Sequence, residues 1–517
     1  MEQKTSSSIK TSLLIGKKAK VCLLSLLILL NLALRIPSIP HEKGYDSFFI
    51  HSLANSISIF GDAQWWINWL SVFGFYAYSY ASAVPFVLSG MHQLLSIEME
   101  VIILIYCVVT GVFSIFTAYV LAGRFSSKFT FKYLAALFFS TSPGVMLFST
   151  WEVSTRGLFI VLLPLFIYLL ISEIHLFKKI ILLFLLLVFQ FSIHHLAFII
   201  IPIMVVYTCL LLLRRTKYFD TIQLNLYLII LPIIVISIIL PFINRSLVES
   251  GSRYSWLITS LISLVRQSGP LFVLSIGGFI YGLFKKDKSI NELLLLILFT
   301  LFIPAIYLHA YGAYLLLLLI VLFISISFFN VTEISINKRF SSVIFIMMIL
   351  LSVTFTGFYN HNRTGESDAY WYMTQDTYVT GIWGKSYIPD NSYGLDTAFE
   401  TGRLFAVSEG HPITPTISAG NLAYGFIKED EIEYVQNSFL QKDFYFEGPY
   451  VVKGGTTVSG RMEWLRQAAT NMEQLSEYKY FVQDKYYIKP VTKVVEQNYG
   501  KVYDSSRMAI WYFDHDK

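Results

Sequence analysis

Charged residues are scarce in this sequence. Asp, Glu, Lys and Arg make up 14% of its 517 residues, whereas a soluble globular domain carries about 25%. Hydrophobic residues make up 55% and aromatic residues 16%, which is typical of a chain with wide lipid-facing and interfacial surfaces. So small a charged fraction excludes a chain that faces water over most of its length. We therefore expect a multi-pass membrane protein.

Cysteine is also rare, and its positions exclude one class of site. The three cysteines, Cys22, Cys107 and Cys209, all lie within apolar runs. The hydrophilic segment after residue 358 contains none. A disulfide framework and a cysteine-ligated zinc site are therefore excluded from that segment.

Apolar runs that can cross a bilayer recur over the first 358 residues, and we expect about eleven transmembrane helices. A spanning helix needs about 20 apolar residues. Residues 180–213 are interpreted as a hairpin of two helices, because one helix of that length would be about 50 Å long and the hydrocarbon core is about 30 Å thick. The expected helices cover 18–35, 100–123, 132–150, 157–172, 180–193, 195–213, 222–243, 268–284, 291–308, 312–330 and 340–358.

Connections rich in Lys and Arg alternate with connections poor in them along the chain. Cytoplasmic loops of membrane proteins carry the excess of Lys and Arg. This rule predicts a protein of the cell membrane with a cytoplasmic N-terminus and an extracytoplasmic segment after residue 358. The connections poor in Lys and Arg for their length are 36–99, 151–156, 194–195, 244–267 and 309–311, and the intervening connections are basic.

The composition changes abruptly after residue 358, where Asp, Glu, Lys, Gly and Thr become common. We therefore expect a transmembrane domain over 1–358, with a long first outer loop over 36–99, and an extracytoplasmic soluble domain of mixed α/β fold over 359–517. The spacing of apolar residues predicts helices over 429–440 and 459–478 and strands over 403–407, 480–482 and 508–513.

The first outer loop opens with the cluster Gly44-Tyr45-Asp46-Ser47-Phe48-Phe49-Ile50-His51. A carboxylate at the boundary between water and lipid can take a proton from an acceptor hydroxyl. It can also ligate a divalent ion that holds a phosphate leaving group. The alternative is a loop acid that caps the following helix. Asp46 is accordingly our candidate catalytic residue.

The cluster resembles the start of the GT-C membrane glycosyltransferases, which include the archaeal and eukaryotic oligosaccharyltransferase catalytic subunits and the dolichyl-phosphate-sugar mannosyltransferases. The layout of many spans, a long first outer loop and an external C-terminal α/β domain is similar as well. Further points of resemblance are Arg35-Ile36-Pro37, Ser142-Pro143-Gly144, Trp151-Glu152 and Arg156-Gly157.

The resemblance implies a GT-C-like fold and roles for two acids. Asp46 matches the acid of the first loop, and Glu152 lies near the place of a second acidic motif. Together they are the implied ligands of a divalent cation, Mg²⁺ or Mn²⁺. Thr155-Arg156 stands about where the family has its acid, and a Trp-Trp-Asp-Tyr-Gly motif is missing. These departures favour transfer of one sugar over transfer of a whole glycan to an asparagine.

Other polar residues on the predicted outer side are candidates for binding a substrate phosphate or sugar. A guanidinium is well matched to phosphate, although an arginine at such a depth also reaches toward the headgroups without a ligand. Two adjacent histidines at the tip of the 180–213 hairpin are functional candidates, and an interfacial turn is the alternative. The substrate- or phosphate-binding candidates are Arg156, His194, His195, His51, Glu152, Arg245 and Arg253.

The resemblance implies that the protein is an enzyme, a glycosyltransferase of hexosyltransferase type. It would move a sugar from a polyprenyl- or dolichyl-phosphate donor to a glycan or protein acceptor on the outer face. Asp46 would act as base, and Arg156 would stabilise the leaving phosphate. Membrane lipid and the lipid-linked donor are the expected partners, and nucleic acid is not. The alternatives are a transporter or flippase for lipid or solute and a non-catalytic membrane protein with an external binding domain.

Overall fold

The computed structural model describes the chain from residue 16 to residue 513, with several gaps. The described residues are 16–76, 78–243, 255–308, 311–334, 338–362, 372–389, 392–397, 401–411, 418–434, 450–452, 468–469, 473–476 and 478–513. Arg245 and Arg253 therefore lie outside the described residues.

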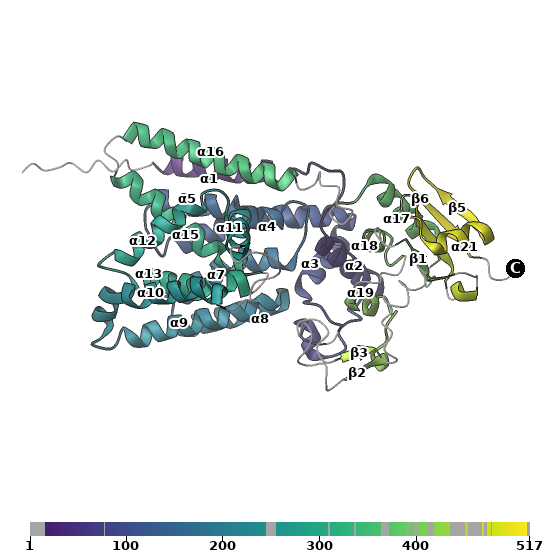
Figure 1. Cartoon of the computed structure of the whole chain (residues 1–517), viewed down its shortest axis with the longest axis horizontal. Helices are drawn as coiled ribbons and strands as arrows, with labels where there is room; N and C mark the ends of the chain where they lie inside the picture. The colour runs from purple at the N-terminus through teal and green to yellow at the C-terminus, as the bar shows by residue number, and fades with distance from the viewer. Residues whose placement is uncertain are drawn as a thin grey trace, which may run out of the picture.

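A bundle of long helices forms one end of the molecule (Figure 1). α15 lies inside it, with Leu316, Leu317 and Phe323 at most 1% exposed, and it packs against α5, α11 and α12. The helices are α1 (Lys17–Leu34), α4 (Met99–Ala122), α5 (Phe129–Ser140), α6 (Pro143–Leu147), α7 (Thr155–Ile171), α8 (Leu176–Ile193), η2 (His195–Ile199), α9 (Ile200–Leu213), α10 (Phe219–Ile243), α11 (Ser255–Ser268), α12 (Phe272–Phe284), α13 (Ile290–Phe302), α14 (Ala305–Leu308), α15 (Gly312–Ile334) and α16 (Lys338–Asn362).

Seven stretches of this bundle, among the described residues, are long and apolar enough to cross a membrane. The number becomes eight when the bent pair α11–α12 is taken as one span. Large apolar side chains on α8, α10 and α16 point outward and are exposed, as bilayer-facing side chains are. The protein is therefore a multi-pass membrane protein. The stretches are Met99–Ala122, Leu176–Ile193, His195–Leu213, Gln223–Pro241, Ile290–Tyr307, Gly312–Thr332 and Phe340–His361.

Each of the eleven expected spans coincides with helix, although the number eleven is not confirmed. The expected span 132–150 is broken after Ser140, because Pro143 starts the separate short helix α6. The expected span 268–284 meets α11 at a bend of 93° beside Gly269, whose φ is 84°. α5 and α7 are apolar but shorter than the other spans. Hydropathy alone does not reveal such breaks.

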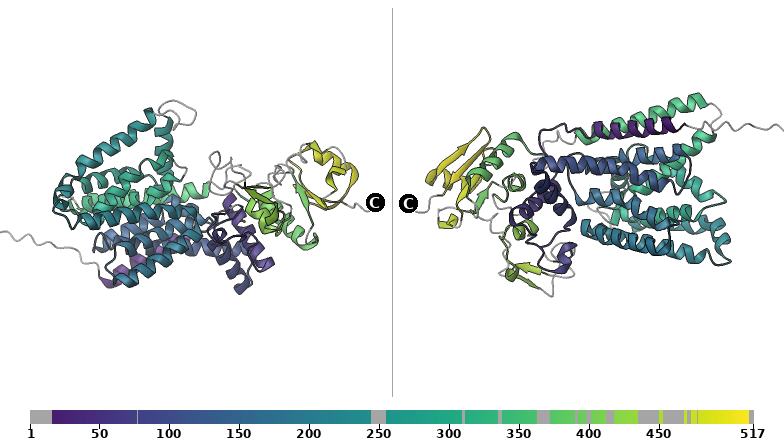
Figure 2. Two further views of the ribbon diagram at one scale, coloured as in Figure 1. Left: turned by 90° about the horizontal axis from the view of Figure 1, so that it is seen from below. Right: turned by 180° about the vertical axis from the view of Figure 1, so that it is seen from behind.

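α2 (Tyr45–Phe60) and α3 (Ala83–Leu95), with the short helix η1 (Trp69–Val72) between them, lie between the bundle and the C-terminal region (Figures 1 and 2). α2 begins after Gly44 and ends at Gly61, which has a left-handed φ of 79°. Phe48, Ile50 and Leu53 are at most 2% exposed. α2 packs against α3 and α4 and also against α18 and α19. It therefore joins the two ends of the molecule.

The C-terminal region contains a four-stranded sheet of strand order β1-β4-β6-β5. β1 and β4 are parallel, and the other two pairs are antiparallel. β2 and β3 form a separate antiparallel pair. The elements are α17 (Gln375–Tyr387), β1 (Gly394–Asp396), α18 (Thr401–Val407), α19 (Ser418–Ala423), η5 (Glu429–Glu431), β2 (Ile432–Tyr434), β3 (Tyr450–Val452), η6 (Glu473–Leu475), β4 (Tyr480–Asp484), α21 (Pro490–Asn498), β5 (Gly500–Asp504) and β6 (Met508–Tyr512).

The mixed α/β character expected here is present, and β4 and β6 occur at the expected positions. Two expectations were wrong. Residues 403–407 are helical in α18, because this short apolar run is buried throughout and carries no periodicity that separates helix from strand. The expected helix at 429–440 begins as η5 and becomes β2, which pairs with the distant β3. Most of the expected helix 459–478 lies outside the described residues.

Arg35 anchors the end of α1 within the bundle. The residue is 1% exposed, and its guanidinium donates hydrogen bonds to Asn31 Oδ1 (2.7 Å), Ser149 Oγ (3.0 Å) and the carbonyl oxygen of Ser140 (3.0 Å). Gly111 of α4 lies directly against this side chain, and a Cβ atom there would overlap Arg35 Nε.

We expect Gly111→Ala to destabilise the bundle by about 1–3 kcal/mol, because the added methyl group must displace a buried, fully engaged arginine. Thermal unfolding in detergent measures the effect. Gly90→Ala in α3 is the matched control, since a Cβ atom there meets nothing within 4 Å. Equal unfolding temperatures for the two variants would contradict this account of Arg35.

Candidate active site

Asp46 and Arg156 form an ion pair where the first turns of two helices meet. Asp46 lies in the first turn of α2, where the helix dipole favours a negative charge. Arg156 lies in the first turn of α7, which Ser154 caps by accepting a hydrogen bond from the Arg156 backbone N–H. Ser154 Oγ also donates to Asp46 Oδ2 (3.0 Å), and Arg156 Nη2 pairs with the same oxygen. Two segments 110 residues apart in sequence thus meet at one carboxylate.

Two aromatic rings hold the Arg156 guanidinium in place. Its Cζ atom lies 5.0 Å from the centre of the Phe148 ring and 4.8 Å from the centre of the Tyr311 ring. Cation–π contacts of this kind strengthen when the cation is partly removed from water, and the Arg156 side chain is 18% exposed. The guanidinium is therefore positioned in advance of any ligand.

A cavity of about 310 Å³ opens beside this ion pair. Asp46, Glu152 and Arg156 line it, together with Arg266 and Gln267 from the end of α11. The bend between α11 and α12 turns the chain just after these two residues. Gly144 makes room for Gln267, because a Cβ atom there would lie 2.5 Å from Gln267 Oε1. Two arginines and one amide on the same cavity are donors suited to a phosphate group.

Glu152 packs against the start of α2. It is 3% exposed, and a Cβ atom on Gly44 would lie 2.5 Å from its Cγ and 2.8 Å from its Oε1. Gly44 also has a φ of 91°, a backbone angle that residues other than glycine rarely adopt. Glycine at position 44 is thus required both by the backbone and by the close approach of Glu152.

A buried polar network behind the cavity fixes the segment that carries Glu152 and Ser154. Glu42 is its centre: Ser47 Oγ donates to Glu42 Oε2 (2.8 Å), and His51 Nδ1 lies 2.5 Å from Glu42 Oε1. The backbone N–H of Val153 in turn donates to Ser47 Oγ (3.2 Å). Glu42 thereby positions the 152–154 segment without lining the cavity.

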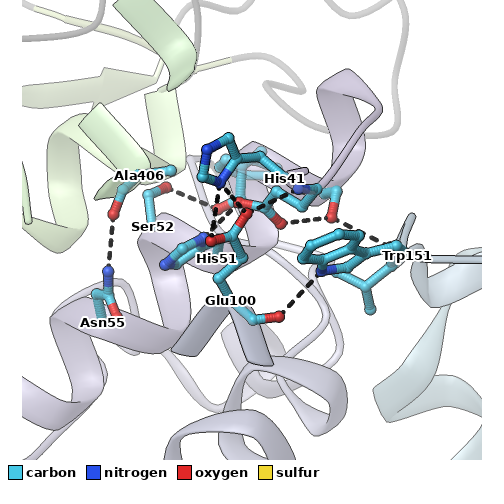
Figure 3. A network of polar contacts seen from close by, with 11 residues as sticks. His41, His51, Ser52, Asn55, Glu100, Trp151 and Ala406 are labelled. Atoms are coloured by element: carbon cyan, nitrogen blue, oxygen red, sulfur yellow. Dashed lines mark hydrogen bonds and ion pairs between the residues drawn. The ribbon is translucent and has the colours of Figure 1, made fainter. Parts of the chain in front are cut away.

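The same network includes His41 and Glu100 (Figure 3), and it reaches the C-terminal region through His41. His41 Nδ1 lies 3.1 Å from Glu100 Oε1, which also accepts a hydrogen bond from the Glu42 backbone N–H (2.8 Å). His41 Nε2 lies 2.9 Å from Gln375 Oε1, and the His41 ring stacks on Tyr378 at 4.0 Å. The start of α17 is thus tied to the loop that precedes Asp46.

His194 and His195 lie beside Tyr311, whose ring Arg156 also contacts. His194 Nδ1 accepts a hydrogen bond from the Leu196 backbone N–H (3.0 Å) and so caps η2. The two histidine rings are 4.0 Å apart, and each is 6.2 Å from the Tyr311 ring that Arg156 contacts. These residues are therefore neighbours of the cavity through one aromatic ring.

Comparison with solved structures finds proteins of similar fold. The oligosaccharyltransferase of Archaeoglobus fulgidus in its apo form matches with a TM-score of 0.58 at 13% identity, over 97% of this chain and 75% of that chain. ArnT from Cupriavidus metallidurans bound to undecaprenyl phosphate matches with a TM-score of 0.52 at 11% identity, over 95% of this chain and 97% of that chain. This chain has a GT-C-like fold.

A third match is the archaeal oligosaccharyltransferase AglB from Archaeoglobus fulgidus in complex with an inhibitory peptide and a dolichol-phosphate. It has a TM-score of 0.54 at 14% identity, over 96% of this chain and 74% of that chain. No protein-family model matches the sequence, and no curated protein matches it. The likeness is thus one of fold, consistent with the resemblance inferred from the sequence.

The GT-C-like fold gathers most of the candidate residues, and some of them lie elsewhere. Asp46, Glu152 and Arg156 line one cavity, and His194 and His195 lie nearby. His51 is buried behind the cavity against Glu42. Sequence reasoning missed the polar groups His41, Glu42, Glu100 and Gln267. An acid at the start of a spanning helix, as at Glu100, was the available signal.

The described residues do not fit the two-carboxylate cation site that the resemblance implies. No group of three or more His, Cys, Asp or Glu in the described part of the chain is placed to hold a metal ion. Asp46 and Glu152 do line the same cavity, but the Asp46 carboxylate is paired with the Arg156 guanidinium. That guanidinium would repel a divalent cation at Asp46.

The two histidines of the network have raised pKa values. Burial lowers the pKa of His51, but the charge and hydrogen bond of Glu42 outweigh it, and Glu100 and Glu409 act in the same direction. Burial likewise lowers the pKa of His41, and Glu100, Gln375 and Glu42 outweigh it. A raised folded-state pKa stabilises the protein fully below the unfolded value of about 6.5. The stabilisation is lost as pH rises through the folded-state pKa.

We therefore expect the unfolding temperature to fall as pH is raised from about 6 to about 9, with a smaller fall when both His41 and His51 are replaced by Gln. Each unit by which a pKa is raised corresponds to about 1.4 kcal/mol. Thermal unfolding in detergent at constant ionic strength measures the slope. His175→Gln, at an exposed position, should keep the wild-type slope. An unchanged slope in the double variant would rule out this role of the network.

Proposed function

We propose that this protein is a membrane glycosyltransferase that transfers one sugar from a polyprenyl-phosphate donor to an acceptor. The observation that carries the proposal is the cavity where Asp46 and Arg156 meet beside Arg266. The GT-C-like fold supports it, because similar structures include complexes with a dolichol-phosphate and with undecaprenyl phosphate. The proposal assigns the donor phosphate to the two arginines and the acceptor to the side of Asp46.

The two arginines stabilise the leaving group in this proposal. The acceptor oxygen forms a bond to the anomeric carbon while the bond from that carbon to the phosphate oxygen breaks. Negative charge then grows on the polyprenyl phosphate, and fixed positive charge near that oxygen lowers the barrier. Gln267 is a further donor on the same wall of the cavity. A single displacement of this kind inverts the configuration at the anomeric carbon.

Asp46 receives the proton of the acceptor hydroxyl in the same step. Its Oδ2 atom holds Ser154 and Arg156, so that the carboxylate is fixed in orientation. A donor phosphate competes with Asp46 for the Arg156 guanidinium. Binding of the donor phosphate to Arg156 thereby leaves the Asp46 carboxylate available to the acceptor hydroxyl.

The isoprenoid tail of the donor lies along α11 in this proposal. Leu257, Ile258, Leu261 and Ile262 of α11 are each at least 40% exposed, and Arg266 follows them at the cavity. A chain lying on these apolar side chains would bring its phosphate to the arginine. The amphipathic pattern of α11 suits a helix at the surface of a bilayer.

We place the cavity at the extracytoplasmic face. The alternation of basic connections supports a cytoplasmic N-terminus. In this arrangement residues 1–358 form the transmembrane domain and residues 359–517 form a soluble domain outside the cell. The acceptor then reaches Asp46 from that side, between the bundle and the C-terminal region.

We expect Asp46→Asn to lower the rate of sugar transfer by about 10²–10⁴-fold, because the amide cannot take up the acceptor proton. The assay uses undecaprenyl- and dolichyl-phosphate esters of radiolabelled glucose and mannose, with release of polyprenyl phosphate as a second readout. Asp62→Asn, at an exposed position in the same loop, is the matched control. Wild-type transfer by the Asp46→Asn variant would refute the assignment. Donor binding without turnover in the wild type would favour a non-catalytic protein.

Arg156 supplies the positive charge beside Asp46, so its removal should affect the donor most. We expect Arg156→Gln to lose about 10²–10³-fold in kcat/KM for the donor. Arg156→Lys should retain part of that activity, since the charge remains without the fork geometry. Wild-type transfer should also continue in the presence of a chelator. Abolition of transfer by a chelator, reversed by Mg²⁺ or Mn²⁺, would show that Arg156 does not fill this role alone.

A further inference from the structure

A second cavity, of about 400 Å³, lies at the opposite end of α2 from Asp46. Ile59 and Phe60 of α2 line one side of it, and residues of the C-terminal region line the other. Phe60 lies 14 residues after Asp46 along α2, which corresponds to a rise of about 21 Å. This cavity is therefore separate from the candidate active site.

Four aromatic rings line the second cavity and remain accessible. Phe60 is 46% and Tyr393 is 41% exposed, and Tyr424 and Phe426 are half-buried beside them. Tyr393 meets Phe426 edge to face at 5.2 Å, and Phe60 meets Tyr424 in the same way at 6.1 Å. The four rings thus form one continuous aromatic surface. Exposed aromatic groups gathered around a cavity are a feature of binding sites.

A pair of opposite charges lies next to these rings. Lys385 Nζ is 2.7 Å from Glu409 Oε1, and both side chains are partly exposed, at 37% and 27%. The His411 ring lines the same cavity and is fixed by Tyr480, whose hydroxyl lies 2.9 Å from His411 Nδ1. The cavity wall therefore offers hydrogen-bond donors and acceptors side by side. The Lys385–Glu409 pair carries no net charge.

The backbone that presents Glu409 adopts an unusual conformation. Glu409 has a φ of 56° and Gly410 a φ of 102°, and a non-glycine residue in the left-handed region is uncommon. Tyr424 packs against Gly410, where a Cβ atom would lie 2.6 Å from Tyr424 Cδ1. The Tyr424 hydroxyl donates to the Ser52 carbonyl oxygen of α2 (2.9 Å). Strain of this kind is concentrated at binding and catalytic sites.

We propose that the second cavity binds a neutral oligosaccharide, the acceptor glycan of this enzyme. This inference rests on the proposed transferase function. Sugar rings present C–H groups that pack on the electron-rich faces of aromatic rings, and their adjacent hydroxyls can donate to Glu409 and accept from Lys385. A ligand without net charge suits the balanced ion pair. An acceptor held here, about 21 Å from Asp46, extends several sugar units along α2 to the reacting hydroxyl.

Direct binding measurements on the purified full-length protein in nanodiscs test this inference. The probes are maltotetraose, mannotetraose and chitotetraose, with an uncharged tetrapeptide as the competing class of ligand. We expect at least one tetrasaccharide to bind, and Tyr393→Ala and Glu409→Gln to weaken it about tenfold or more, as truncation of a binding hot spot does. Tyr486→Ala is the matched control, since Tyr486 is 77% exposed on another part of the C-terminal region.

Asp46→Asn separates this inference from the proposed function. That variant should lose transfer and keep wild-type affinity for the tetrasaccharide. Transfer activity without tetrasaccharide binding, or binding unaffected by Tyr393→Ala and Glu409→Gln, would overturn the carbohydrate site and leave the transferase proposal standing. Binding of the tetrapeptide alone, lost in the same two variants, would also overturn it. Tetrasaccharide binding without sugar transfer by the wild type would support the carbohydrate site and refute the transferase proposal.

Discussion

The carboxylate of Glu42 is completely removed from solvent, and a buried carboxylate is costly unless its oxygens are hydrogen bonded. Ser47 and His51 of α2 provide those partners. Ser47 Oγ also accepts a hydrogen bond from the Val153 backbone N–H. The start of α2, the loop before it and the loop before α7 therefore adopt one joint arrangement. The Asp46–Arg156 pair forms because this buried network holds the two segments together.

This buried network also couples the bundle to the C-terminal region. His41 connects Glu100 at the start of α4 with Gln375 at the start of α17. Loss of one member would leave the others buried without their partners, which costs more than a surface ion pair contributes. The two ends of the molecule are thus joined through specific polar contacts as well as through apolar packing of α2.

Much of the helical bundle is predictable from the sequence, because spanning helices require long apolar runs and such runs are visible directly. The breaks are less visible, since Pro143 and Gly269 interrupt helices within otherwise apolar segments. The C-terminal region is harder, because its strands gain their partners from far away in sequence. Ile432 pairs with Val452, and a local pattern of apolar residues does not contain that information.

The candidate site is predictable in part for the same reason. Asp46, Glu152 and Arg156 stand out as polar groups beside spanning segments, and they do line one cavity. Glu42 and Gln267 do not stand out, because their importance comes from contacts with residues that the fold brings close. Gly44 looks like an ordinary loop glycine until the position of Glu152 is known. Long-range packing therefore decides which polar residues of a membrane protein share a site.

α2 has a consequence for which acceptors the protein can use. One end of this helix carries Asp46 and the other end borders the second cavity, and a helix is a stiff rod whose length is set by its residue count. On the proposals above, the fixed length of α2 sets the distance between the acceptor-binding cavity and Asp46, and so selects acceptors by chain length. Adding or removing one residue would rotate one end by about 100° relative to the other. Insertions or deletions in α2 that preserve both sites would therefore add or remove whole helical turns, so that the preferred acceptor length would change in steps.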